Sequence, residues 1–152
     1  MGERGTMLRG NARATIDKKG RLKIPTKYRR IIEETHGREF FVTSLDGQAA
    51  SLYPFPLWLR VEANIASHPS LSKPIMRLVR LLNYYGDESA MDSQGRILLQ
   101  AHLREQAQLE GEVSVLGHND HLEIWNLDRV KAHVQAESLS DEDYKTLSDF
   151  GL

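Results

Sequence analysis

The sequence repeats itself, and this repeat restricts the chain to folds that are built twice from one unit. Residues 17–29 match residues 92–104 at a constant offset of 75, with Asp, Gly and two Arg identical and the apolar positions similar in character. A second block, 41–53, matches 113–125 at an offset of 72. Because both blocks keep their order and their apolar pattern, we interpret the chain as a duplicated unit.

Each unit is expected to begin with a hairpin. In the first unit the segments 12–16 and 21–24 are strand-like, and they flank Asp17-Lys18-Lys19-Gly20. The Asp and Gly of this segment are typical of a tight turn, since Gly adopts the left-handed backbone conformation with little steric cost. The same pattern in the second unit predicts a second hairpin around residues 92–95.

A helix and a second pair of strands should follow each hairpin. Pro25 suits the first turn of a helix that ends at Gly37, and the segments 40–44 and 50–53 are strand-like. The second unit repeats this plan with strands in 113–116 and 122–125. The order strand, strand, helix, strand, strand predicts an α+β fold.

Helices should join the two units and form the tail. Pro54 and Pro56 open a predicted helix that runs through Ile65, and Ser72-Lys73-Pro74 is expected to cap another that ends at Gly86. The tail is expected to be helical from Asn126. A further turn or helix should follow Ser140, where Asp143 completes a Ser-x-x-Asp start signal.

The net charge of −1 hides an uneven distribution of charge along the chain. Residues 1–60 carry 12 Lys and Arg against 6 Asp and Glu, whereas residues 61–152 carry 8 against 15. Seven of the cations lie within residues 16–30, where Asp17 is the single acid. Such clustering points to a polyanionic partner, because electrostatic steering and counterion release depend on the local patch.

Comparison of the two hairpins separates shared residues from unshared ones. The shared Asp and Arg are four residues apart and can pair across the turn, which favours a structural role for Asp17, Gly20, Asp92, Gly95 and Arg96. Arg21 could pair with Asp17, touch DNA or do both. The unshared residues Lys18, Lys19, Lys23 and Lys27 are the better candidates for phosphate contacts, the alternative being a merely solvated face.

In their order and spacing these motifs resemble those of the bacterial MraZ family. The matching segments are Met7-Leu8-Arg9-Gly10, Asp17-x-x-Gly20-Arg21 with Ile24-Pro25-x-x-Tyr28-Arg29, Leu52-Tyr53-Pro54-x-x-x-Trp58, and Met91-Asp92-x-x-Gly95-Arg96. The resemblance implies two AbrB-like, swapped-hairpin β-barrel half-units, with bridging helices and a helical C-terminus. The expected parts are a leader or upstream remnant (1–6), a first unit (7–53), bridging helices (54–86), a second unit (87–126) and a helical tail (127–152).

The resemblance also implies a function. It implies a sequence-specific DNA-binding transcriptional regulator that forms a ring-shaped homo-oligomer and is associated with the nucleoid. Its targets would include short direct repeats in the promoter of its own operon, in the division and cell-wall gene cluster. The family's DNA contacts map to the first hairpin, hence to Arg13, Lys18, Lys19, Arg21 and Lys23, with Arg9 as a less direct match.

An enzyme is not expected from this sequence. There is no cysteine, no phosphate-cradling Gly-rich loop, no nucleophile elbow and no paired-carboxylate motif, so we expect no catalytic residue, cofactor or small-molecule substrate. His118-x-x-His121 has a spacing that could ligate a metal, but it lies on an expected hairpin turn with no evident third ligand. We therefore interpret it as a polar turn and expect no metal site.

Two further expectations concern location and partners. The longest apolar stretch, around Leu78–Leu82, is too short to span a bilayer, and the N-terminus lacks the apolar run of a signal peptide, so we expect a cytoplasmic protein without a membrane partner. The alternative function is an AbrB-like antitoxin or interaction module whose acidic half, including residues 137–149, binds a partner protein. Trp58 and Trp125 could be exposed anchors for a partner, but at their helix-entry and strand-end positions tryptophans are more often core residues or subunit contacts.

Overall fold

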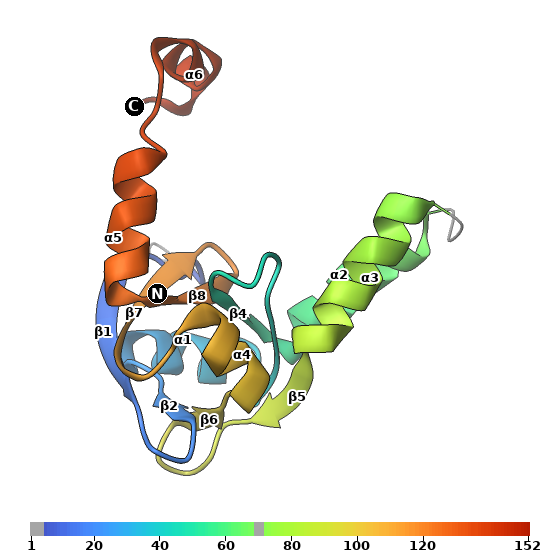
Figure 1. Ribbon diagram of the computed structural model, residues 1–152, viewed down its shortest axis with the longest axis vertical. Helices are drawn as coiled ribbons and strands as arrows, with labels where there is room; N and C mark the ends of the chain where they lie inside the picture. The colour runs from blue at the N-terminus through green and yellow to red at the C-terminus, as the bar shows by residue number, and fades with distance from the viewer. Residues whose placement is uncertain (1–4, 69–71) are drawn as a thin grey trace.

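The computed structural model describes residues 5–68 and 72–152, so four residues of the predicted leader lie outside the description. Its centre is one eight-stranded antiparallel sheet in the order β5-β3-β4-β8-β7-β1-β2-β6. The end strands β5 and β6 contact each other, so the sheet curls into a nearly closed barrel (Figure 1). The strands are β1 Asn11–Ile16, β2 Arg21–Lys23, β3 Glu39–Thr43, β4 Ala50–Pro54, β5 Asp87–Ala90, β6 Arg96–Leu98, β7 Gly111–His118 and β8 His121–Asn126.

The two halves of the chain interleave within this sheet. Strand β1 pairs with β7, β2 with β6, β3 with β5 and β4 with β8, so each strand of one half has a neighbour from the other half. Closing the barrel in this way leaves few unpaired strand edges. The predicted α+β fold of duplicated half-units is confirmed, and the first hairpin matches its predicted strands to within a residue at each end.

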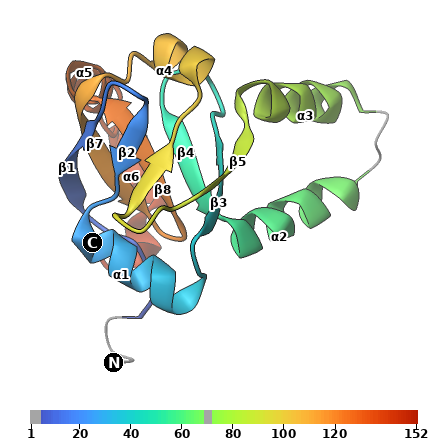
Figure 2. The ribbon, with the colours of Figure 1, turned by 90° about the horizontal axis from the view of Figure 1, so that it is seen from below.

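The core is made from equivalent positions of the two repeats. Leu22 and Ile97 face each other across β2 and β6, and each is at most 1% exposed. Helices α1 (Thr26–Thr35) and α4 (Ala101–Ala107) lie on opposite sides of the barrel and bury Tyr28 and Leu103 against it (Figure 2). The apolar residues that the repeat retains are therefore the residues that fill the barrel.

Helices α2 (Phe55–Ala66) and α3 (Lys73–Tyr85) extend away from the barrel as an arm (Figure 1). The arm is anchored by a small cluster in which the rings of Phe41 and Trp58 stack with centroids 4.4 Å apart and Leu82 is buried. Ser72 occupies the N-cap position of α3, as predicted, but its side chain accepts no capping hydrogen bond. Pro74 at the second helical position has no N–H, which removes one of the usual donors.

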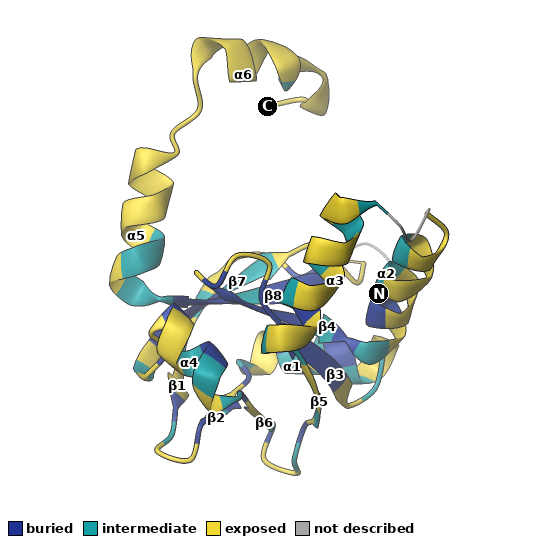
Figure 3. Ribbon diagram, turned by 45° about the vertical axis from the view of Figure 1, so that its right-hand side comes forward, coloured by how far each residue is buried: buried dark blue, intermediate teal, exposed yellow. Residues whose placement is uncertain are grey.

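The tail forms two helices, α5 (Leu127–Ala136) and α6 (Asp141–Thr146), and a short 3₁₀ turn, Ser148–Phe150. The Asn126 side chain accepts the Arg129 N–H at 2.9 Å and so caps α5. The predicted start signal of α6 is confirmed, because Ser140 and Asp143 exchange hydrogen bonds between side chain and backbone. Figure 3 shows both helices projecting from the barrel with largely exposed surfaces.

Across residues 5–68 and 72–152, the helices are all too short or too polar to pass through a bilayer.

Candidate nucleic-acid interface

The turn of the first hairpin is built around the carboxylate of Asp17. One oxygen, Oδ1, accepts the backbone N–H groups of Lys19 and Arg21, both at 2.9 Å. The other oxygen, Oδ2, accepts Nε–H of Arg21 at 2.8 Å. Gly20 closes the turn at φ +87°, where a residue with Cβ would be strained. The pairing of Asp17 with Arg21 that the sequence spacing suggests is present.

The second turn has the same geometry without the lysines. Asp92 accepts the backbone N–H groups of Gln94 and Arg96 at 2.9 Å and Nε–H of Arg96 at 2.8 Å. In both turns the backbone N–H of the Arg, followed by its side chain, lowers the pKa of the Asp below the usual 3.8. Both carboxylates are therefore charged at neutral pH and are engaged by the turn itself.

Each turn is held by residues of the other half of the chain. The Leu99 N–H donates to the Gly20 carbonyl, and the Ile24 N–H donates to the Gly95 carbonyl, both at 2.9 Å. Both turns project at the same end of the barrel (Figure 3). The family resemblance implies half-units that exchange their hairpins. In this protein the exchange takes place between the two halves of one chain.

Arginines from α1 and α4 reinforce this exchange. The guanidinium group of Arg104 lies against Gly20, where a Cβ would come within 2.7 Å of it, and Arg29 lies against Gly95 in the same way. These two arginines are identical positions of the repeat, but sequence reasoning gave them no role. The repeat identity was the signal that could have found them.

The predicted cations lie on the exposed side of the first hairpin. Strand alternation places Arg13, Arg21 and Lys23 outward, with Leu22 inward, and Lys18 and Lys19 are exposed at the turn. Arg13 makes an ion pair with Glu112 at 3.3 Å. Such a pair between exposed groups contributes little to stability, so the Arg13 guanidinium can exchange Glu112 for a phosphate at little cost.

A second group of cations lies beside the start of β1. Arg9, Lys27 and Arg30 line a hollow of about 550 Å³ together with Tyr28. The Tyr28 hydroxyl donates to the Gly10 carbonyl at 2.7 Å, and Lys27 Nζ lies 4.9 Å from the Tyr28 ring centre. Burial raises the pKa of Tyr28, so its hydroxyl keeps the proton that it donates. This hydrogen bond ties the segment that carries Arg9 to α1.

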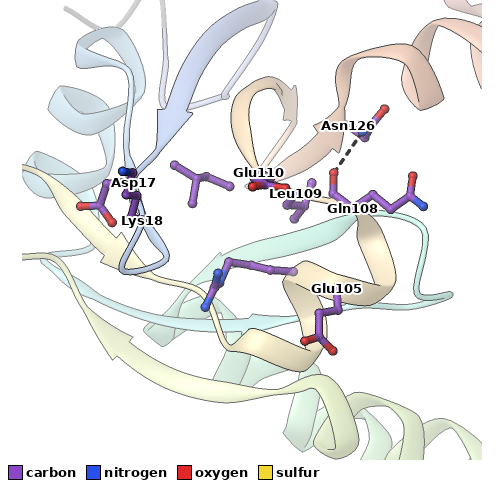
Figure 4. A pocket seen from close by; sticks show the side chains of 9 residues that line it. Asp17, Lys18, Glu105, Gln108, Leu109, Glu110 and Asn126 are labelled. Carbon is purple, nitrogen blue, oxygen red and sulfur yellow. Dashed lines mark hydrogen bonds between the residues drawn. The ribbon is translucent and has the colours of Figure 1, made fainter.

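A larger hollow of about 920 Å³ lies behind the first turn (Figure 4). It is lined by Asp17 and Lys18 on one side and by α4 and the segment after it on the other, including Glu105 and Glu110. Arg104 also lines the hollow, so that its three carboxylates are mixed with two cations. The hollow therefore lacks the excess of cations found on the outer face of the hairpin.

The β7–β8 turn differs from the sequence expectation. His118 and His121 face each other across the two strands, and Glu123 offers a carboxylate oxygen, so that one ligand atom from each of the three residues lies within 4.8 Å of the others. The expectation that the histidine pair lacks a third ligand is therefore wrong, because strand alternation brings Glu123 to the same face as His121. Burial lowers the pKa of His121, which favours its neutral form.

Both tryptophans are core residues in this chain. Trp58 is 3% exposed and packs on Phe41, and Trp125 is 6% exposed, with its indole N–H donating to Glu123 at 3.1 Å. Of the alternatives for the tryptophans, the core position that the sequence favours is therefore confirmed, and the exposed anchor is excluded.

Comparison with known proteins gives a consistent result. The family model of the MraZ protein, described as antitoxin-like, matches residues 7–81 and 86–150. A protein of Acidobacterium capsulatum named transcriptional regulator MraZ is 40% identical over 146 residues, which cover 96% of this chain and all of that protein. Proteins with the same name from Koribacter versatilis and Nitrosomonas europaea are 42% and 39% identical, over 96% and 80% of this chain and over 100% and 82% of their own lengths.

Proposed function

This chain belongs to the MraZ family, and we propose that it is a transcriptional regulator that binds double-stranded DNA through its first unit, residues 7–53. One observation carries the proposal. Two turns of the same geometry project at one end of the barrel, and only the first carries exposed lysines. Because the second turn forms without these lysines, the fold does not need them, and contact with phosphate is a use that explains them.

We propose separate roles for two groups of residues, one that contacts DNA and one that shapes the turns. Lys18 and Lys19 at the turn and Lys23 on β2 bind phosphates, while Arg13 and Arg21 lie on the same outer face of the hairpin, and Arg9 extends this surface toward the start of β1. Asp17 and Gly20, with Asp92, Gly95 and Arg96 in the second half, hold the two turns in shape.

We further propose that the chain acts as a homo-oligomer arranged as a ring. The arm supports this proposal, because Leu59, Met76 and Val79 are exposed on α2 and α3 and the two helices line an apolar hollow of about 550 Å³. Exposed apolar surface of this kind is typical of an interface. Several copies of the first hairpin could then contact neighbouring sites on one DNA molecule.

The family resemblance suggests the target. We propose that the protein binds short direct repeats upstream of its own gene, in the operon for division and cell-wall synthesis, and that it works in the cytoplasm at the nucleoid.

A footprint on the DNA upstream of the gene tests the whole proposal. We expect protection of repeated boxes there and none on unrelated DNA of equal length and base composition. The variant Lys18→Ala/Lys19→Ala should lose protection, whereas the matched variant Ser93→Ala/Gln94→Ala in the second turn should keep it. Equal, unspecific protection of both DNAs would contradict the proposal. A pull-down that recovers a tightly bound toxin in place of DNA would support the antitoxin alternative.

A further inference from the structure

The end of the β7–β8 hairpin presents three metal-binding groups on one face. His118 on β7 is directly opposite His121 on β8, and Glu123 follows two residues later on the same strand. One ring nitrogen of each histidine and one carboxylate oxygen of Glu123 lie within 4.8 Å of one another. The rings of the two histidines stack with their centres 4.6 Å apart, so the two imidazoles lie face to face.

Hydrogen bonds to neighbouring residues orient two of these three groups. Nδ1 of His121 lies 2.8 Å from Oδ1 of Asp120, so donation of this N–H leaves Nε2 with the free electron pair. Histidines that bind metals are commonly oriented by such a carboxylate. The indole N–H of Trp125 donates to Oε1 of Glu123 at 3.1 Å and leaves Oε2 for another partner.

The surroundings of His121 restrict its movement. The residue is only 7% exposed, and the Tyr53 ring stacks on its imidazole with centres 4.2 Å apart. His118, by contrast, is exposed at the end of β7. A fixed ligand beside a movable one is an arrangement that can close on an ion, because only one side chain has to change its rotamer.

We propose that His118, His121 and Glu123 bind a divalent transition-metal ion, Zn²⁺ being the best match. Two imidazole nitrogens and one carboxylate oxygen form a ligand set that zinc accepts at about 2.0–2.2 Å. Hard ions such as Mg²⁺ prefer sites made of oxygen ligands alone, and should bind here weakly. A hollow of about 500 Å³ borders both histidines and gives room for a water molecule as the fourth ligand.

The bound ion would link strands β7 and β8. The turn that it closes contains Asn119, whose carbonyl accepts the Leu8 N–H at 2.7 Å, and Leu8 precedes β1. Zinc would therefore stiffen the turn and, through this hydrogen bond, the segment that leads into the first hairpin. Metal binding itself does not depend on the proposed DNA function.

Titration of the untagged, metal-free protein with zinc chloride by calorimetry tests the proposal. We expect one Zn²⁺ per chain, a rise in the midpoint of thermal unfolding on zinc addition, and no comparable response to magnesium chloride. His118→Ala removes an exposed ligand and should weaken zinc binding more than about tenfold, since even outer partners of a metal site contribute 10- to 100-fold. Glu123→Gln keeps the Trp125 hydrogen bond but removes the charge, and should also weaken binding.

The matched control is His68→Ala, which removes another exposed histidine, at the end of α2. This variant should bind zinc as the unchanged protein does. The proposal is overturned if the unchanged protein binds no zinc, if several weak ions bind per chain, or if His118→Ala and His68→Ala bind zinc equally well.

Discussion

The guanidinium group of Arg104 on α4 packs against Gly20 at the tip of the first hairpin, although the two residues belong to different halves of the chain. Its Nε–H also donates to the Leu99 carbonyl at 3.0 Å, and the Leu99 N–H donates to the Gly20 carbonyl. Arg104, Leu99 and Gly20 thus form a continuous set of contacts from the second half of the chain to the first turn. The position of the lysine-bearing first turn therefore depends on Arg104, which lies outside that turn on α4.

We expect Arg104→Ala to weaken DNA binding about fivefold, since removing a hydrogen bond of this kind costs about 1 kcal/mol and loosens the turn. If Arg104 acts only by positioning the turn, the dependence of log K on log salt concentration should keep its slope. The matched change Arg29→Ala loosens the second turn and should lower stability but leave DNA affinity nearly unchanged. A smaller salt slope for Arg104→Ala would show instead that Arg104 contacts a phosphate directly.

The lysines of the first turn make a separate prediction. The double variant Lys18→Ala/Lys19→Ala should fold normally, because Ser93 and Gln94 occupy the same positions in a turn of equal geometry. Its salt slope should fall by about 0.9 for each phosphate that the variant no longer binds. Binding isotherms at several salt concentrations measure this slope, with Ser93→Ala/Gln94→Ala as the control. An unchanged slope would remove both lysines from the interface.

The two turn carboxylates predict a dependence of stability on pH. The pKa of Asp92 is lowered from 3.8, mainly by the Arg96 backbone N–H and then by the Arg96 side chain. The charged form therefore stabilises the folded state above pH 3.8, and this stabilisation disappears as the pH falls through the lower folded-state pKa. Asp92→Asn should lower the thermal midpoint at neutral pH and flatten its decline in acid, measured by circular dichroism.

The same variant separates the roles of the two turns. Asp92→Asn should retain DNA binding once it is folded, whereas Asp17→Asn should impair both stability and binding, because it disturbs the turn that carries the lysines. Normal stability of Asp92→Asn together with a loss of DNA binding would make the second hairpin a DNA-contacting element.

Affinity should rise steeply with the number of DNA boxes. In the proposed mode one hairpin would make few phosphate contacts, so a single copy should bind within the nonspecific range of about 10⁻⁴–10⁻⁶ M. In an oligomer the first contact raises the effective concentration of the next, provided that boxes spaced by about 10 bp face the same side of the DNA. Binding to one, two and three boxes, and to a set with one box moved by half a turn, measures this effect. Equal affinity for all four DNAs, or tight binding by a demonstrated monomer, would exclude the multivalent model.

The sequence by itself determined the local elements of this protein. Asp17 and Gly20, the first and last residues of one turn, have counterparts in Asp92 and Gly95, and both turns form where this pattern predicts them. The strands that flank the second turn, β5 and β6, pair with β3 and β2 instead of with each other. Such a turn depends on residues close together in the chain, so spacing alone is enough to predict it. The same holds for the capping pair Ser140 and Asp143. The start of α3 at Ser72-Lys73-Pro74 is also where the sequence predicts it, although the Ser72 side chain accepts no capping hydrogen bond.

Only the tertiary structure decided which distant residues meet. The pairing of β2 with β6 places Arg104 on Gly20 and Arg29 on Gly95, and the register of β7 with β8 places His118 opposite His121 and near Glu123. A repeat in the sequence says that two hairpins exist, but not that their strands interleave or in which register. Register is set by burying one face of every strand in a common barrel, and that requirement involves the whole chain at once.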